Sequence, residues 1–327
     1  MPDLLAAEGS IGEPAINISI FGVFVLITLV ITFRASRNNK SAADYYAAGR
    51  NISATQNGLA IAGDYLSAAS FLGIAGAIAV YGYDGFLYSI GFLVAWLVAL
   101  LLVAELMRNT ARFTMADVLA FRMRQGPVRT AAAISTLVVS LFYLLAQMAG
   151  AGGLVTLLLG ISGEAAQAAV VVVVGALMIF YVLVGGMRGT TYVQVIKASL
   201  LIIGALVMTV WVLGKYGFNL SALIGGAIDK GGQAVAEPGA QYGLTGTTKL
   251  DFISLGLALV LGTAGLPHVL MRFYTVPTAK EARRSVVWAI WVIGIFYLFT
   301  LVLGFGAGAL VGPEKISKAP GTTNAAA

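Results

Sequence analysis

Two of the long apolar stretches in this chain are interrupted near their middle by glycine and polar residues. The first, Gly58–Gly73, carries Asp64, and the second, Gly256–His268, contains Pro267. A helix exposed to lipid is normally apolar and unbroken, because each unpaired backbone group costs several kcal/mol in hydrocarbon. Interrupted helices are tolerated where they line a cavity, and membrane transporters use the exposed backbone ends of such helices to bind substrate and ion.

The composition places the chain in a membrane. Of its 327 residues 59% are hydrophobic and only 10% are charged, and the mean hydropathy is +0.91, whereas soluble domains are about 25% charged. The chain has no cysteine and one histidine, so we expect no disulfides, no thiolate chemistry, no transition-metal site and no cofactor. The acidic N-terminus, with Asp3, Glu8 and Glu13, does not resemble a cleavable signal.

Eight stretches are long and apolar enough to cross a membrane as helices of roughly 20 residues. We therefore predict an all-α membrane protein with about eight transmembrane helices. A glycine-rich segment over 216–250 is expected to be an external loop that contains one short interfacial helix, Leu220–Ile228. The predicted spans lie near 16–33, 54–80, 85–107, 130–160, 165–187, 192–214, 251–273 and 285–311.

The basic residues are distributed unevenly between the two sides of these spans. Every arginine falls in one set of connections, at 34–53, 108–129, 188–191 and 272–284. Because cytoplasmic loops are enriched in Lys and Arg, we predict that this set is cytoplasmic and that both ends of the chain lie outside, in a bacterial inner membrane. Lys197 is expected to extend from the sixth span to the interface. The net charge of +6 is then a topology signal and does not indicate a nucleic-acid partner.

The two interrupted spans are the second and the seventh, so the second break begins five spans after the first and the two spans cross in opposite directions. This arrangement is typical of an inverted repeat of five helices. We predict one transmembrane transporter domain over 1–327 with an incomplete five-plus-five fold. Its parts are an extra helix and basic loop (1–53), a first five-helix repeat (54–215), the external loop (216–250) and the first two helices of a second repeat (251–327).

Few polar side chains lie inside the predicted spans. Asp64 is the one deep carboxylate, and we see no basic partner for it at similar depth. It is either a cation or proton site or a structural acceptor beside the break. Ser67 and Ser70 lie one helical turn apart and are either ligands or small packing residues. Tyr143 and Gln147 share one face of the fourth span, where they either line a cavity or tie helices together.

The second break centres on a proline, which removes one backbone donor and frees a carbonyl one turn earlier. Because it matches the break in span two, we favour a cavity lining over a simple kink. His268, which follows directly, is either hydrogen-bonded scaffolding or a proton carrier. The residues that mark this break are Thr263, Gly265, Leu266 and Pro267.

Five segments of the sequence together resemble the solute:sodium symporter family, and within it the cation/acetate and monocarboxylate symporters. The resemblance covers nearly the whole chain, and the fourth and fifth segments are its most specific part. The segments are Gly63–Gly73 (GDYLSAASFLG), Tyr81–Tyr88 (YGYDGFLY), Ala104–Asp117 (AELMRNTARFTMAD), Leu266–Phe273 (LPHVLMRF) and Thr278–Arg283 (TAKEAR).

This resemblance implies an alternating-access symporter that is driven by Na⁺ or H⁺ and carries acetate or a similar short-chain monocarboxylate. It implies a sodium site at the backbone carbonyls of Gly63 and Leu66, and a substrate site at Ser67, Ser70 and Gly265–His268. Members of the family also supply cation ligands from a later helix. We therefore expect this chain to be a family member cut short, which inserts into membranes but does not transport by itself.

Two other classes of function are weighed against transport. A membrane sensor or binding module can share the symporter fold, but no soluble signalling domain follows here. An intramembrane enzyme would need a nucleophile paired with a base, and we find no nucleophile elbow, phosphate-binding loop or HExxH motif. We therefore predict that the protein is not an enzyme.

Overall fold

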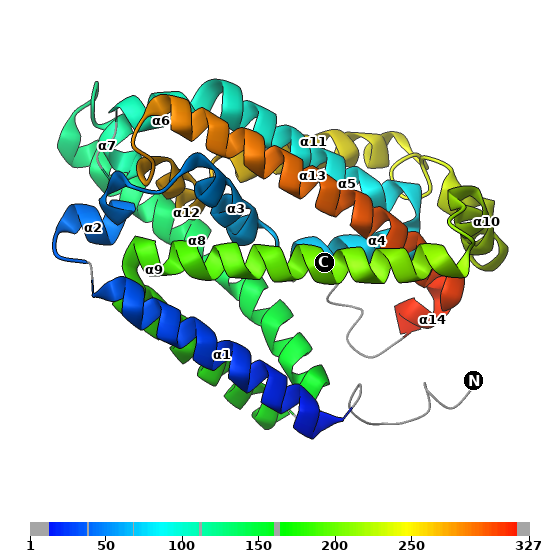
Figure 1. Cartoon of the computed structure of the whole chain (residues 1–327). Coiled ribbons are helices and arrows are strands. Elements are labelled where there is room, and N and C mark those ends of the chain that lie inside the picture. The colour runs from blue at the N-terminus through cyan, green and yellow to red at the C-terminus, as the bar shows by residue number, and fades with distance from the viewer. Residues whose placement is uncertain (1–12, 38, 68, 111–112, 160–163, 319–327) are drawn as a thin grey trace.

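The computed structural model describes residues 13–37, 39–67, 69–110, 113–159 and 164–318, and the regular structure in these ranges is entirely helical. Figure 1 shows long helices side by side, joined by short turns. In chain order the elements are α1 (Pro14–Ser36), α2 (Ala42–Ala47), η2 (Ala48–Arg50), α3 (Ala54–Tyr65), η3 (Ala69–Gly73), α4 (Ile74–Tyr81), α5 (Tyr83–Val98), η4 (Ala99–Val103), α6 (Ala104–Thr110), α7 (Met115–Leu119), α8 (Gln125–Leu159), α9 (Glu164–Lys215), α10 (Leu220–Gly231), η5 (Gln233–Ala236), α11 (Gly246–Ala264), α12 (Pro267–Leu270), η6 (Met271–Tyr274), α13 (Ala279–Leu310) and α14 (Pro313–Lys318).

Within the described residues six helices are long and apolar enough to cross a membrane, or seven if α3 and α4 form one broken span. One of the six, α9, has 52 residues and would be about 78 Å long if straight, more than twice the thickness of a bilayer's hydrocarbon core. It is divided at Gly186, whose backbone (φ 56°, ψ −162°) is not helical. Its two limbs match the spans predicted at 165–187 and 192–214, so the eight predicted segments are all present.

The kink at Gly186 needs a glycine. Its positive φ disfavours a side chain, and a Cβ there would lie 2.9 Å from the Tyr45 ring of α2. The predicted loop 188–191 is helical instead, so the chain turns at a single residue. In Figure 1 the first limb of α9 runs alongside α1, and the second limb runs back beneath α3, α4 and α13 toward α10.

Both predicted helix breaks are present. The helix α3 ends just before Leu66, whose backbone is extended (φ −71°, ψ 103°), and the two halves of this span meet at 69°. The helix α11 ends at Ala264 with Gly265 as its C-cap, Leu266 is again extended (φ −61°, ψ 119°), and α12 begins at Pro267. Proline suits this first helical position, where its missing N–H would have no intrahelical partner.

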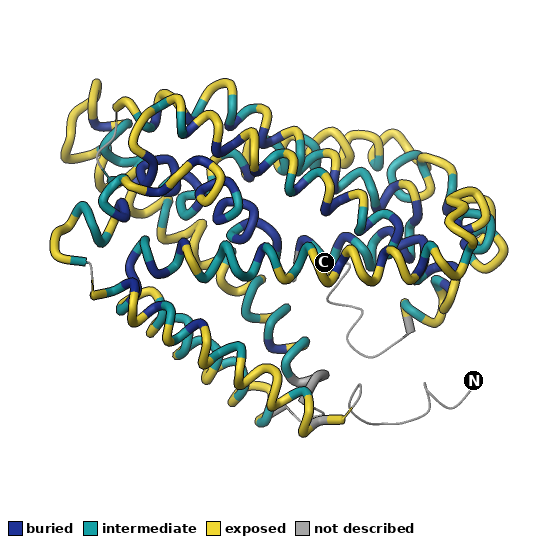
Figure 2. Tube along the Cα trace, viewed as in Figure 1, coloured by how far each residue is buried: buried dark blue, intermediate teal, exposed yellow. Residues whose placement is uncertain are grey.

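The buried core lies where α13 packs against α3, α4 and α5, around side chains such as Trp96, Ile293 and Phe296. Figure 2 shows this inner zone in dark blue, whereas α1 is largely exposed. Large apolar side chains on the outside of α8, among them Leu137 and Phe142, are also exposed. Such surfaces suit helices surrounded by lipid.

The predicted external segment is ordered against the start of α5. The helix α10 confirms the short helix expected at Leu220–Ile228. Asp84 is fully buried and accepts three backbone N–H bonds, from Gly239 (2.9 Å), Gln241 (2.6 Å) and Tyr242 (3.1 Å). The Tyr242 hydroxyl also lies 2.6 Å from that of Tyr88. A carboxylate thus fixes this loop across the turn between α4 and α5.

Candidate functional site

The two helix breaks are joined by a buried ion pair. Asp64 lies in the last turn of α3, and Arg272 lies in η6, directly after the second break. Arg272 Nε is 2.6 Å from Asp64 Oδ2, and Arg272 Nη2 is 3.1 Å from Oδ1, which is the two-pronged geometry of a strong guanidinium–carboxylate pair. Their side chains are 3% and 8% exposed. The expectation that Asp64 has no basic partner is therefore wrong.

Further hydrogen bonds fix the position of Arg272. Its Nη1 donates to Thr191 Oγ1 of α9 at 2.5 Å, and its carbonyl accepts from Asn57 Nδ2 of α3 at 3.1 Å. The hydroxyl of Thr275 lies 2.9 Å from Asn57 Oδ1. Since buried polar groups are costly unless they are hydrogen-bonded, this network locks α3, α9 and η6 together around the ion pair.

Beside the ion pair lies a cavity of about 780 Å³. Its walls come from α2, the break after α3, η3, α8, both limbs of α9, and α12 with η6, and most of the lining is apolar. This is the usual character of a small-molecule site, in which a few polar groups set the orientation of the ligand. The polar and charged side chains of the lining are Tyr45, Tyr46, Asp64, Ser67, Tyr143, Gln147, Thr190, Gln194, Lys197, His268 and Arg272.

Lys197 is a residue of the cavity lining whose position differs from the sequence-based prediction. We expected it to reach the interface, but it lines the cavity. It follows the kink at Gly186 by about three helical turns, or roughly 16 Å of rise along α9. The four ion pairs of the described residues do not include it. If Lys197, Arg272 and Asp64 are counted at their formal charges, the lining carries one excess positive charge.

Two buried polar atoms of the cavity lining lack a hydrogen-bond partner among the described residues. They are Oε1 of Gln194 and Nε2 of His268. The His268 ring also lies against Tyr143, with ring centroids 4.6 Å apart. An unsatisfied buried polar group costs about 1–3 kcal/mol, so both atoms favour a polar ligand or water in the cavity.

The predicted site residues divide into two groups. Asp64, Leu66, Ser67, Gln147 and His268 line the cavity, as does Tyr143. The other six, which the structure places outside the lining, are Gly63, Ser70, Thr263, Gly265, Leu266 and Pro267.

Two of the six residues outside the lining have clear local roles. Gly63 lets α3 approach α9, since a Cβ there would lie 2.3 Å from the Gln194 carbonyl oxygen. The Ser70 hydroxyl accepts from Ser67 N at 2.7 Å and donates to the Tyr65 carbonyl at 3.1 Å. It therefore holds the chain on both sides of the first break.

This arrangement of two interrupted helices beside one cavity is typical of secondary transporters. The profile of the sodium:solute symporter family matches residues 45–327, and the chain belongs to that family. It is a transporter-family protein and not an enzyme, as the sequence predicted.

Two curated relatives are similar over most of this chain. The monocarboxylic acid transporter of Corynebacterium glutamicum is 61% identical over 334 residues, which cover 98% of this chain and 61% of that protein. The uncharacterized symporter YwcA of Bacillus subtilis is 50% identical over 316 residues, covering 95% of this chain and 60% of that protein. The chain thus spans about 60% of the length of these two relatives.

Among solved structures, a Na⁺-coupled sialic acid symporter in a substrate-bound, outward-open state has the same fold. The TM-score is 0.76 at 18% sequence identity, over 95% of this chain and 68% of that chain. At this identity the likeness concerns the fold alone, and it confirms the predicted symporter architecture.

Proposed function

We propose that this chain takes part in cation-coupled symport of acetate or a similar short-chain monocarboxylate. The observation that carries the proposal is the charge of the cavity, where Lys197 and Arg272 face the single carboxylate Asp64. One bound monovalent anion balances this excess. An unbalanced charge is costly inside a membrane, so the cavity favours an anion over a neutral or cationic substrate. The name of the Corynebacterium relative agrees with this choice.

The residues have distinct roles in this proposal. Lys197 attracts the substrate carboxylate, and Ser67, Gln147 and His268 offer it hydrogen bonds. Ser70 supports Ser67 across the break. The second break, Thr263–Pro267, sets the positions of His268 and Arg272 and bends during the transport cycle.

The coupling ion is a co-substrate in this proposal. Na⁺ binds the backbone carbonyls of Gly63 and Leu66 at the first break, near Asp64. If H⁺ is the driver instead, Asp64 is the carboxylate in the cavity that can take up the proton. Uptake under separately imposed Na⁺ and H⁺ gradients distinguishes the two ions.

The test is uptake of labelled acetate into proteoliposomes by a chimera of this chain and the C-terminal part of the Corynebacterium transporter. Lys197→Gln removes the charge that holds the substrate, and we expect KM for acetate to rise about 10–100-fold, as for loss of a hydrogen bond to a charged group. Lys249→Gln, at an exposed lysine of the outer segment, is the matched control. An unchanged KM in Lys197→Gln would contradict the proposal.

We further propose that the 327-residue chain by itself inserts into membranes without transporting. Gly63 and Leu66 offer only two carbonyl oxygens, and a hard cation needs several more, by analogy with the six to eight of calcium sites. Accumulation of acetate by the purified chain alone, under either gradient, would overturn this proposal.

We also propose that the arginine-rich connections face the cytoplasm, so that both chain ends lie outside. Ser41, Gln125 and Gln233 are exposed, and the chain has no native cysteine. Single cysteines at Ser41 and Gln125 should be protected from an impermeant thiol reagent in intact cells, and one at Gln233 should react. The reverse pattern would show the opposite orientation.

A further inference from the structure

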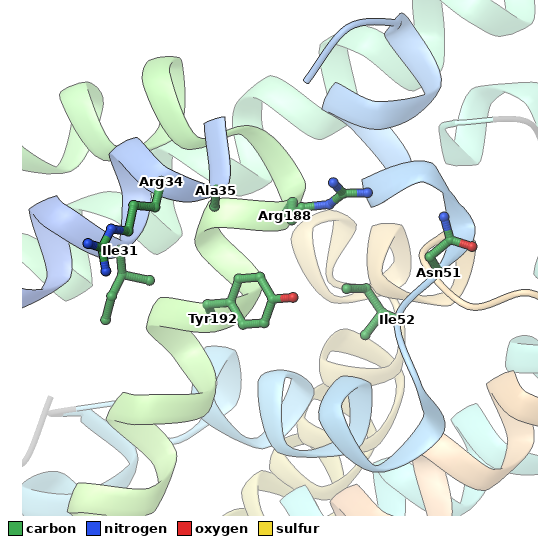
Figure 3. Close-up of a pocket in the computed structure, with 7 residues that line it drawn as sticks. All are labelled: Ile31, Arg34, Ala35, Asn51, Ile52, Arg188 and Tyr192. Atoms are coloured by element: carbon green, nitrogen blue, oxygen red, sulfur yellow. The ribbon is translucent and has the colours of Figure 1, made fainter. Parts of the chain in front are cut away.

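A second cavity, of about 360 Å³, lies between the end of α1, the segment after η2 and the second limb of α9. Figure 3 shows the Tyr192 ring pointing from α9 toward Ile52. The Arg188 side chain points toward the segment that carries Asn51, whereas the guanidinium of Arg34 lies on the other side of the picture, beside Ile31. Its polar lining side chains are Arg34, Asn51, Arg188 and Tyr192, and no carboxylate lines it. Each of the four can donate a hydrogen bond, so the cavity suits an anion.

The walls of this cavity are held in place by the fold. Arg188 and Tyr192 lie one turn apart on the same face of α9, just after the kink at Gly186. Arg188 Nη2 donates to the carbonyl of Ala48 at 3.2 Å. The Ile52 N–H donates to the carbonyl of Thr275 at 3.2 Å. The site is therefore formed before any ligand arrives.

The backbone beside the cavity has an uncommon conformation. Ala48, Gly49 and Arg50 all have positive φ, of 52°, 65° and 58°. Two of these three residues are not glycine, and such residues persist in this region only where surrounding contacts hold them. The turn brings Asn51 and Ile52 to the cavity wall opposite α1.

The cavity lies beside the last turn of α1, where the apolar run of this predicted span ends. Val30 and Phe33 present large exposed apolar side chains, and Arg34 follows in the last turn of the helix. Arg34 makes none of the four ion pairs found among the described residues. The carboxylate of Asp44, whose field reaches Arg188, accepts the Ser41 hydroxyl at 2.8 Å and does not line the cavity. The lining therefore carries positive charge with no carboxylate in it.

We propose that this cavity binds the phosphate of an anionic phospholipid headgroup, with Arg188 and Arg34 as its main contacts. Arg34 is exposed, and its side chain turns in toward the phosphate when the lipid binds. Basic pockets between membrane helices, at the level of the headgroups, bind such lipids. The aliphatic side chains of Ile31, Ala35 and Ile52 pack against the glycerol part of the lipid. Free inorganic phosphate could accept the same hydrogen bonds, but it has no apolar part to pack against Ile31, Ala35 and Ile52. The lipid therefore matches the lining better.

The test is native mass spectrometry of the purified chain in detergent, with phosphatidylglycerol, phosphatidylcholine or inorganic phosphate added at equal concentration. We expect the wild-type chain to retain phosphatidylglycerol preferentially. Arg34→Gln should weaken this binding about fivefold, the effect of one basic residue near an anionic lipid surface. Arg34→Lys, which keeps the charge, should retain most of the binding. Arg37→Gln, which removes a charge from the same end of α1 but not from the cavity lining, is the control.

Three outcomes would overturn the proposal. The first is equal retention of phosphatidylcholine, and the second is an Arg37→Gln effect as large as that of Arg34→Gln. The third is inorganic phosphate that binds in the absence of lipid and displaces phosphatidylglycerol, which would identify a free-phosphate site. Melting of each variant in detergent, compared with the wild type, separates loss of binding from loss of folding. The measurement involves no transport, so its result is independent of the proposed symport.

Discussion

Two aspartates that are buried at opposite ends of neighbouring helices have their charge balanced in different ways. Asp64, at the end of α3, is paired with the guanidinium of Arg272. Asp84, at the start of α5, accepts three backbone N–H groups from the loop over 239–242. The positive end of the α5 dipole also stabilises its negative charge. One carboxylate is neutralised by a side chain and the other by the backbone.

The kind of partner indicates whether each aspartate can exchange it for a ligand or only holds the structure together. A side-chain partner can be exchanged for a ligand, because a bound anion can compete for Arg272 and a cation can compete for Asp64. Backbone N–H groups fixed in a turn have no such alternative. Asp64 lines the cavity and Asp84 does not. We therefore interpret Asp64–Arg272 as the part of the molecule that changes partners, and Asp84 as the part that stays fixed.

The largest effect should come from breaking the inner pair. Arg272→Gln removes the guanidinium paired with Asp64 and leaves the buried carboxylate without its hydrogen-bonded partner, with only Lys197 across the cavity. We expect the free energy of unfolding to fall by about 3–5 kcal/mol. The double variant Asp64→Asn/Arg272→Gln removes both charges and should recover most of this loss. The free energies are measured by unfolding in mixed micelles.

The control for this prediction is an exposed ion pair. Arg283 and Glu105 lie 3.4 Å apart with side chains 56% and 48% exposed, so Arg283→Gln should change stability by at most about 1 kcal/mol. If Arg272→Gln were no more damaging than Arg283→Gln, or if the double variant were worse than the single one, the inner pair would not behave as a buried ion pair.

Most of the fold could be predicted from the sequence, because lipid imposes strong rules on length and polarity. The apolar segments, the breaks at Leu66 and Pro267 and the short helix α10 follow from glycine, proline and hydropathy alone. The predicted loop 188–191 was wrong because a glycine with positive φ reverses the chain without any polar loop residues. Hydropathy does not distinguish a chain that turns at one residue from one with a short loop.

The site was only partly predictable, for a different reason. Asp64, Ser67 and His268 stand out as polar residues beside breaks, and the structure brings them to one cavity. Arg272 and Lys197 were assigned to the membrane boundary, because a base near the end of an apolar run has the same linear pattern whether its side chain faces outward or inward. Only the packing of η6 and α9 against α3 decides which way these two side chains point.

Removing the Asp84 carboxylate should have a smaller effect on stability, confined to the loop whose N–H groups it accepts. Asp84→Ala leaves three backbone N–H groups without their acceptor, although water can reach some of them in the loosened loop, and we expect about 2 kcal/mol of lost local stability. Hydrogen exchange at Gly239, Gln241 and Tyr242 should accelerate, while exchange in α3 and η6 stays unchanged. Asp229→Asn, at an exposed acid of α10, should change neither. Faster exchange in α3 would show that the two aspartates are coupled and not separate.

The smallest effect concerns the contact between the Tyr88 and Tyr242 hydroxyls, 2.6 Å apart, which fastens the same loop. Tyr88→Phe removes one hydrogen bond and should cost about 1 kcal/mol, seen as a modest rise in exchange at Tyr242.

The same hydrogen bond makes the loop sensitive to high pH. Burial is the largest cause that raises the pKa of Tyr242 well above its ordinary value of 10.0, and the hydrogen bond to Tyr88 is the next largest. A group whose pKa is raised by folding stabilises the fold below its unfolded pKa and loses that contribution as pH rises through the folded value. The protection of the loop amides, taken relative to the base-catalysed exchange of the unfolded chain at the same pH, should therefore fall above about pH 10. Tyr83→Phe, at an exposed tyrosine of the same turn, should leave this fall unaltered. If Tyr88→Phe loosened the loop more than Asp84→Ala, the attachment of the loop would depend on the tyrosine pair and the comparison of the two aspartates would fail.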